Sequence, residues 1–166
     1  MFHKLGDFLD SWGYETEATV RVFEKLTDQA LSRRVTSEGR TLGRIAWHIV
    51  QTIPEMGGRT GLPVAGPGEE GPIPESAGEI LARFQESADS LATEIRARWT
   101  DADLDAEDDM YGETWRRGRT LGVIIIHQAH HRGQMTVLMR QAGLPVPGVY
   151  GPSREEWAGY GMPPQE

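Results

Sequence analysis

Cysteine is absent from the 166-residue sequence. Disulfide bonds, thiolate metal ligands and a thiol nucleophile carried by the protein are therefore excluded. Long apolar runs are also absent, because no segment approaches the ~18 consecutive apolar residues of a membrane-spanning helix. At the N-terminus, Gly6 and Asp7 fall where a signal peptide needs an unbroken apolar stretch. We therefore expect a cytoplasmic protein that folds as a single domain over residues 1–166.

Basic residues are scarce. The 17 lysines and arginines oppose 25 aspartates and glutamates, which gives a formal net charge of -8. Such a surface repels phosphate backbones. The densest basic cluster, Arg116, Arg117 and Arg119, is too small to form a nucleic-acid-binding stripe. We therefore expect neither nucleic acid nor a membrane as a partner, which leaves small molecules and a second copy of the chain.

Four segments place apolar residues at the three- and four-residue steps of a helix, and no segment gives a comparable signal for a strand. Thr41 is a good N-cap for the second segment, and Pro54 should kink or end that helix. Ser76 and Glu79 form a capping-box pattern before the third segment. Thr120 opens the fourth. The expected helices cover about 5–26, 41–53, 76–95 and 120–142.

The connection between the second and third helices, residues 57–75, is unusually long. Ten of its 19 residues are Gly or Pro, which predicts irregular structure. Fully extended it could reach ~60 Å, whereas adjacent antiparallel helices usually need only ~2–8 residues between them. We therefore expect a long crossover between two helices that run the same way, in an all-α four-helix bundle with up-down-down-up topology. Residues 100–118 and the tail from residue 144 should be loops packed over the bundle ends.

Two histidines share one face of the fourth expected helix. His127 and His131 stand at positions i and i+4, which lets two imidazoles converge on one metal ion. The same face carries the apolar residues expected in the core. A buried imidazole needs a partner, because an unsatisfied buried polar group costs ~1–3 kcal/mol. Solvation at the surface is therefore a poor explanation for this pair.

A short internal repeat adds a third histidine. The segment from Thr41 to His48 matches the segment from Thr120 to His127 at Thr, Leu, Gly, Ile and His. Each of these histidines lies about 10 Å along its helix from the expected cap, so antiparallel helices would bring both to mid-bundle. Together with His131, they suit one divalent transition metal with an open position, such as Zn, Ni, Co, Fe or Mn. Taken alone, His48 is also explained as a hydrogen-bonded histidine of the core or its edge.

Two further polar residues lie close to the histidines on the fourth helix. His130 could add a ligand only by the weaker i, i+3 geometry, and otherwise belongs to a helix or dimer contact. Gln134, one turn beyond His131, is a candidate for contacting a histidine ligand or a bound cofactor. Gln134 is equally explained as a polar residue that finds its hydrogen bonds inside the bundle.

The pattern of these residues resembles a known family. His48 in a second helix, followed much later by the string from His127 to Gln134 with its His-His-Arg-Gly-Gln ending, is similar to the DinB/YfiT-like metalloprotein superfamily. The resemblance implies an up-down-down-up bundle, often a homodimer, with a metal held by His48, His127 and His131. In some relatives glutamate stands where this chain has His127. Characterised members of that superfamily include thiol S-transferases and isomerases that use bacillithiol or mycothiol, so the resemblance implies an activity of this kind.

A thiol transferase of this kind needs a group that accepts the thiol proton. Glu55, seven residues beyond His48, is the first candidate, and a surface acid is the alternative interpretation. Arg132 could orient an anionic cofactor, although its helical position points away from the histidine face, and a structural role is the alternative interpretation. Two other functions stay open: a hydrolase that uses metal-bound water, and a metal-binding stress protein without catalytic activity.

The remaining face of the fourth helix predicts a homodimer. Ile126, His130, Gly133 and Val137 cluster on this face, and the small Gly133 would let another backbone approach closely. The alternative is that this face packs against the first or third helix of the same chain.

Overall fold

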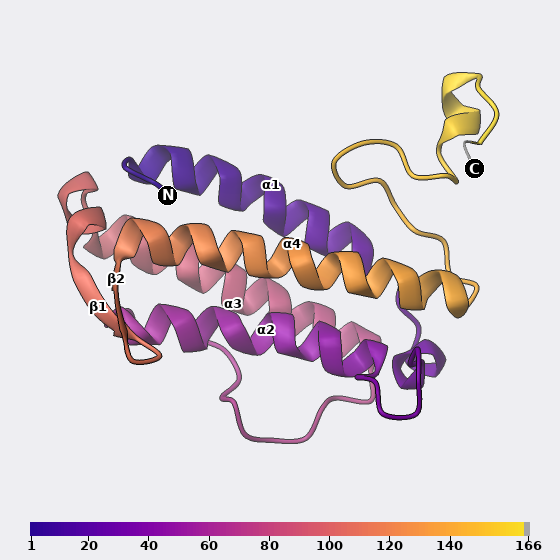
Figure 1. The fold of residues 1–166 in the computed structure, drawn as a ribbon, viewed down its shortest axis with the longest axis horizontal. Coiled ribbons are helices and arrows are strands. Elements are labelled where there is room, and N and C mark those ends of the chain that lie inside the picture. The colour runs from indigo at the N-terminus through magenta and orange to yellow at the C-terminus, as the bar shows by residue number, and fades with distance from the viewer. Residues whose placement is uncertain (165–166) are drawn as a thin grey trace.

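A computed structural model of the chain describes residues 1–164, and its main body is a bundle of four helices (Figure 1). Three short 3-10 helices and one small hairpin complete the fold. The helices of the bundle are α1 (Leu5–Phe23), α2 (Leu42–Arg59), α3 (Ala77–Arg98) and α4 (Arg117–Gln141). The 3-10 helices are η1 (Asp28–Ser32), η2 (Asp101–Asp105) and η3 (Trp157–Tyr160), and the strands are β1 (Glu107–Met110) and β2 (Glu113–Arg116).

The four helices confirm the expected up-down-down-up topology. Around the bundle the order is α1, α3, α2, α4, so that α2 and α3 are parallel neighbours and α2 and α4 are antiparallel neighbours. The long connection after α2 runs back along the outside of the bundle and starts α3 at the same end as α2 (Figure 1). No helix within residues 1–164 is long and apolar enough to cross a membrane.

Helix ends follow the local sequence at two of the expected caps. The Thr41 hydroxyl accepts a hydrogen bond from the backbone N–H of Arg44, and the Ser76 hydroxyl accepts one from Glu79. The helix does not end at Pro54, which was one of the two outcomes expected there, because α2 continues through it to Arg59. Ile53 and Met56 on either side are buried, at 0% and 3% exposure. Their packing outweighs the ~3 kcal/mol cost of a proline within a helix.

The start of α4 also differs from the expectation. The helix begins at Arg117 rather than at Thr120, whose hydroxyl lies one turn inside the helix and bonds the carbonyl of Arg116. Strand β2 leads directly into α4, and Arg117 pairs with Asp108 of β1 at 2.9 Å. The backbone of Phe2 packs against this first turn, where a Cβ on Gly118 would lie 2.1 Å from the Phe2 carbonyl oxygen. Tertiary contacts therefore extend the helix beyond its sequence signal.

Residues 100–118, expected as a loop, form η2 and an antiparallel hairpin at one end of the bundle (Figure 1). Tyr111 and Gly112 make the two-residue turn, with φ of 62° and 82°. This is the geometry of a type I′ turn, which ordinarily takes Asn, Asp or Gly at both positions. Tyr111 is the only non-glycine residue with positive φ in the described chain. The tail after α4 is irregular apart from η3, as expected.

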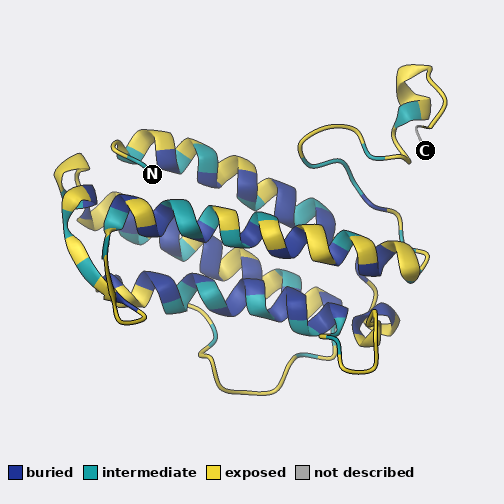
Figure 2. Ribbon diagram, viewed as in Figure 1, coloured by how far each residue is buried: buried dark blue, intermediate teal, exposed yellow. Residues whose placement is uncertain are grey.

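The core fills the space between the helices, and their outward faces are exposed (Figure 2). One charged pair lies within it. Arg132 of α4 pairs with Glu15 of α1, and the two residues are only 2% and 7% exposed. The same guanidinium bonds the Thr19 hydroxyl, and the phenol of Tyr150 bonds both charged groups. Arg132 is thus a structural residue, which was the alternative to its orienting an anionic cofactor.

Candidate metal centre

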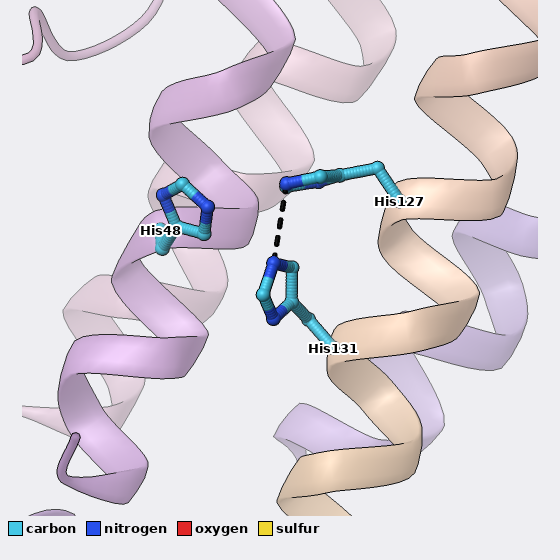
Figure 3. A group of neighbouring side chains, drawn as sticks. All are labelled: His48, His127 and His131. Atoms are coloured by element: carbon cyan, nitrogen blue, oxygen red, sulfur yellow. Dashed lines mark hydrogen bonds between the residues drawn. The ribbon is translucent and has the colours of Figure 1, made fainter. Parts of the chain in front are cut away.

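Three imidazoles meet between α2 and α4 (Figure 3). His48 comes from α2, while His127 and His131 stand one turn apart on α4. The ring centroids are 4.9 Å apart for His48 and His127, 4.8 Å for His48 and His131, and 4.4 Å for His127 and His131. One nitrogen of each ring lies within 4.8 Å of the others. The structure therefore brings together the three histidines singled out from the sequence.

The internal repeat explains only in part why His48 and His127 lie at the same level of the bundle. His48 lies seven residues after its N-cap Thr41, as expected. His127 lies eleven residues after the actual N-cap of α4, Arg116. The shared spacing to Thr41 and Thr120 therefore does not measure equal distances from two helix ends. The antiparallel packing of α2 on the longer α4 brings the rings to the same level.

One hydrogen bond from outside the cluster constrains the tautomer of His131. Gln134 Oε1 lies 2.7 Å from His131 Nδ1, a contact that is satisfied when Nδ1 carries the proton. His131 Nε2 is then unprotonated, and it lies 3.1 Å from His127 Nε2. Two nitrogens bound to one tetrahedral ion at ~2.0–2.1 Å would be about 3.3 Å apart. The spacing of the two Nε2 atoms thus fits ligation of one metal ion.

Burial keeps these imidazoles neutral. It lowers the pKa of His48 from 6.5 to about 4, and the neighbouring His131 and two arginines act in the same direction. Burial likewise lowers the pKa of His127 to about 4, with His131 and His48 as the next largest causes. The pKa of His131 is also lowered by burial, against the opposing effect of the hydrogen bond that it donates to Gln134. Neutral imidazole is the form that binds a metal.

The alternative interpretation, a set of hydrogen-bonded core histidines, accounts for both nitrogens of His131 and for His127 Nε2, but it leaves the other nitrogens of the cluster without partners. His127 Nδ1 is buried without a hydrogen bond. The imidazole of His48 makes no hydrogen bond to any residue that the structure describes. Unsatisfied buried nitrogens cost ~1–3 kcal/mol each. The donor set and its missing partners together fit a divalent transition metal better than a packed polar core.

His130 stands apart from the three. Its ring centroid lies 4.9 Å from that of His131, but the residue is exposed and its Nε2 contacts Gln134 Nε2 at 3.2 Å. Gln134 therefore links His130 to His131 and holds the outer nitrogen of His131. This placement makes Gln134 a positioning residue for one imidazole of the cluster.

A cavity of about 550 Å³ opens beside the cluster and is lined by His48 and His127. Glu55 lies on its wall rather than on the outer surface. Its Oε2 accepts a 2.6 Å hydrogen bond from the phenol of Tyr111, and its Oε1 pairs with Arg59. Burial raises the pKa of Tyr111, and the hydrogen bond to Glu55 acts in the same direction. The turn between β1 and β2 therefore places the protonated phenol of Tyr111 at the wall of the cavity.

Arg44, at the other end of the cavity, was missed in the sequence. One stripe of α2 carries Arg44, His48, Gln51 and Glu55 at the i, i+4, i+7 and i+11 positions, and all four line the cavity. Arg44 Nη1 donates to Gln51 Oε1 at 2.9 Å. Extending the helical spacing one turn before His48 would have found it. Its contact with Gln51 depends on the crossover, which the sequence does not position.

Comparisons with known proteins agree with this architecture. The model of the DinB family matches residues 1–166. The chain is 44% identical over 162 residues to the uncharacterized protein YrdA of Bacillus subtilis (strain 168), covering 98% of this chain and 97% of that protein. A crystal structure of a DinB-like protein from Bacillus cereus has a TM-score of 0.87 and 44% identity, covering 90% of this chain and 100% of the other. A DinB-like protein of Bacillus subtilis, YjoA, shares the fold with a TM-score of 0.66 at 16% identity, covering 84% and 96%.

Proposed function

This chain belongs to the DinB family, and we propose that it holds one divalent metal, zinc or nickel, at His48, His127 and His131 and acts as a metal-dependent thiol S-transferase. A metal at this position supplies a Lewis acid that lowers the pKa of a small thiol. The thiol comes from a separate molecule, since the chain has no cysteine. The overall reaction forms a carbon–sulfur bond on an electrophile, breaks the bond from that carbon to a leaving group that departs with the electron pair, and releases the thiol proton to a base.

The observation that carries this proposal is the open cavity beside the three imidazoles. A closed structural metal site takes a fourth protein ligand, whereas a catalytic site keeps one position for a substrate or water. Among residues 1–164, the cluster of potential metal ligands contains only the three histidines. The cavity of about 550 Å³ lies in the size range of small-molecule sites. An enzyme is therefore favoured over a metal-storage or purely structural role.

Glu55 is the proposed proton acceptor. Its carboxylate lines the same cavity as His48 and His127, so a ligand between them comes within reach. Both oxygens already accept a hydrogen bond, one from Tyr111 and one from Arg59. Accepting a proton requires one of these partners to move. Tyr111, at the tip of a hairpin and 54% exposed, is the partner with more freedom to do so.

A hydrolase that uses metal-bound water is the second candidate, because three histidines and an open position serve that chemistry equally well. The experiment that separates the candidates begins with elemental analysis of the purified protein. Loss of a small thiol is then followed with a panel of electrophiles, using bacillithiol, mycothiol and cysteine as thiols. Thiol-dependent product formation supports the transferase. Thiol-independent ester or amide cleavage would replace it with the hydrolase, and metal binding without either activity would leave a non-catalytic protein.

Variants of adjacent histidines provide the control for these assays. His127→Ala should lose both metal and activity, whereas the neighbouring His130→Ala should retain both. Activity that survives in metal-free His127→Ala would contradict the proposal.

We also propose that the chain forms a homodimer through α4. Ile126, His130, Gly133 and Val137 are all exposed, and the large apolar Ile126 and Val137 are 68% and 52% exposed. The intrachain alternative, packing of this face against α1 or α3, is therefore wrong. A second copy of the chain would cover these apolar side chains, and Gly133 allows a close approach.

A further inference from the structure

The cavity beside the histidines carries an uncompensated positive charge at one end. Arg44 lines it one helical turn before His48, about 6 Å along α2. Within residues 1–164 neither Arg44 nor the nearby Arg40 forms a salt bridge. Arg44 shares the cavity wall with His48 and His127, and Arg40 lines a second hollow together with Gln134, the residue that contacts His131. The imidazoles are neutral and offer no negative charge in return.

The acidic groups of the cavity lie toward its other end. Glu55 is about 10 Å beyond His48 along α2, and both of its oxygens are engaged by Arg59 and Tyr111. Glu69 is exposed and lines a further hollow together with Glu55 and Arg59, at that same end. Neither acid forms an ion pair with Arg44. A divalent ion at the histidines would add further positive charge between the two ends.

Arg44 is held in position by Gln51, which is itself hydrogen-bonded to the crossover between α2 and α3. Gln51 is only 4% exposed, and its Nε2 donates to the carbonyls of Gly68 and Glu69 at 2.8 and 2.9 Å. These two acceptors fix the orientation of the amide, so Oε1 must face Arg44 Nη1. Only one of the five guanidinium N–H groups is used in this way. The edge formed by Nε and Nη2 makes no hydrogen bond to the described residues, and this planar edge matches the two oxygens of a carboxylate.

We propose that the small molecule bound in this cavity carries a carboxylate a few bonds from the atom that faces the histidines, and that Arg44 binds this carboxylate. The inference rests on the proposed function, because it names the chemistry of the ligand for the same site. It gives the two ends of the cavity different roles. Arg44 selects and orients the anion, while Glu55 accepts the proton.

The test uses two thiols of similar size and different charge. The Co²⁺-loaded protein is titrated with thioglycolate, which carries a carboxylate, and with 2-mercaptoethanol, which is neutral. Binding is read from the sulfur-to-cobalt absorption band, without any measurement of activity. The ratio of the two dissociation constants is compared among wild type, Arg44→Gln and Arg44→Lys. The matched control is Arg21→Gln, which removes a half-buried arginine without a salt bridge from a groove lined by α1 and α3 residues.

We expect the preference for thioglycolate to fall about tenfold in Arg44→Gln, the range of one charge-assisted bidentate contact at a partly exposed site. The preference of Arg44→Lys should lie between those of wild type and Arg44→Gln, because lysine keeps the positive charge but cannot make the bidentate contact of a guanidinium. Arg21→Gln should match wild type, and equal cobalt content in all four proteins establishes that the metal site is intact. An unchanged ratio in Arg44→Gln, or an equal loss in Arg21→Gln, would overturn the inference.

A sulfur-free pair separates this inference from the proposed function. If neither thiol binds, propionate and propionamide are titrated by calorimetry into the same proteins. Propionate binding that depends on Arg44 would retain the carboxylate site and reject the thiol function. If propionate and propionamide bind equally, or if neither binds, both the carboxylate site and the thiol function are rejected.

Discussion

Lowering the pH should release a bound metal only in strongly acidic solution. Ordinary imidazoles begin to take up protons near pH 6.5. Here burial lowers the pKa of both His48 and His127 to about 4. Protons therefore compete poorly with a metal between pH 7 and 5. We expect the apparent affinity to be nearly flat over this interval and to fall below it, by up to about tenfold per pH unit for each protonated ligand.

The same shifts make the metal-free protein less stable in acid. The folded-state pKa lies below the unfolded value of about 6.5, so the unfolded chain binds more protons between pH 6.5 and 4. Stability is therefore complete above pH 6.5 and is lost as the pH falls toward 4. A shift from 6.5 to about 4 corresponds to about 3 kcal/mol per histidine without screening. Because these rings are only partly buried, solvent reduces this to about 1–2 kcal/mol each.

Two measurements check this reasoning. Metal affinity is measured by competition with a chromophoric chelator at pH 7, 6, 5 and 4, with circular dichroism to establish that the protein stays folded. Urea unfolding of the metal-free protein at pH 7 and 4.5 gives the stability change, and His48→Phe should reduce it. A metal-release midpoint near pH 6.5, or metal-free stability that does not change between the two pH values, would refute the argument.

Three other predictions concern the cluster, the core and the assembly. His127→Ala should abolish stoichiometric metal by elemental analysis while His130→Ala retains it, and the reverse result would discard the ligand assignment. Arg132→Met should cost about 3–5 kcal/mol in urea unfolding, because it leaves the Glu15 charge buried and unpaired. Adding Glu15→Leu should recover most of this loss, and equal stability of the single and double variants would contradict the pairing. Wild type should sediment as a dimer at tens of micromolar and Gly133→Leu as a monomer with unchanged helix content; a monomeric, metal-loaded wild type would end the dimer proposal.

Local sequence signals sufficed where the determining contacts are local. Thr41 and Ser76 cap helices through their own side chains, so their positions are readable in a few residues. The long crossover could be predicted because its length and composition exclude a tight helical hairpin. The spacing of His127 and His131 is a property of one helix. Each of these features depends on neighbours in the chain.

Features that depend on distant segments were missed or misplaced. Pro54 stays helical because packing on other helices outweighs its local cost. The hairpin around Tyr111 follows no clear alternation of apolar residues, and a tyrosine at positive φ is not a recognised turn signal. The partner of Arg132 could not be identified from the sequence, because Glu15 lies 117 residues away. Arg44 acquires its orientation only through the crossover carbonyls.

The buried Arg132–Glu15 pair has a consequence for how α1 and α4 align. These helices are the first and last of the bundle and run parallel, so no short loop fixes how far one slides along the other (Figure 1). A slip of one turn, about 5.4 Å, would separate the two charges inside the core at a cost of several kcal/mol. Because Arg132 directly follows His131, we infer that the ion pair sets the axial register of α4 and thereby the height at which its imidazoles meet His48.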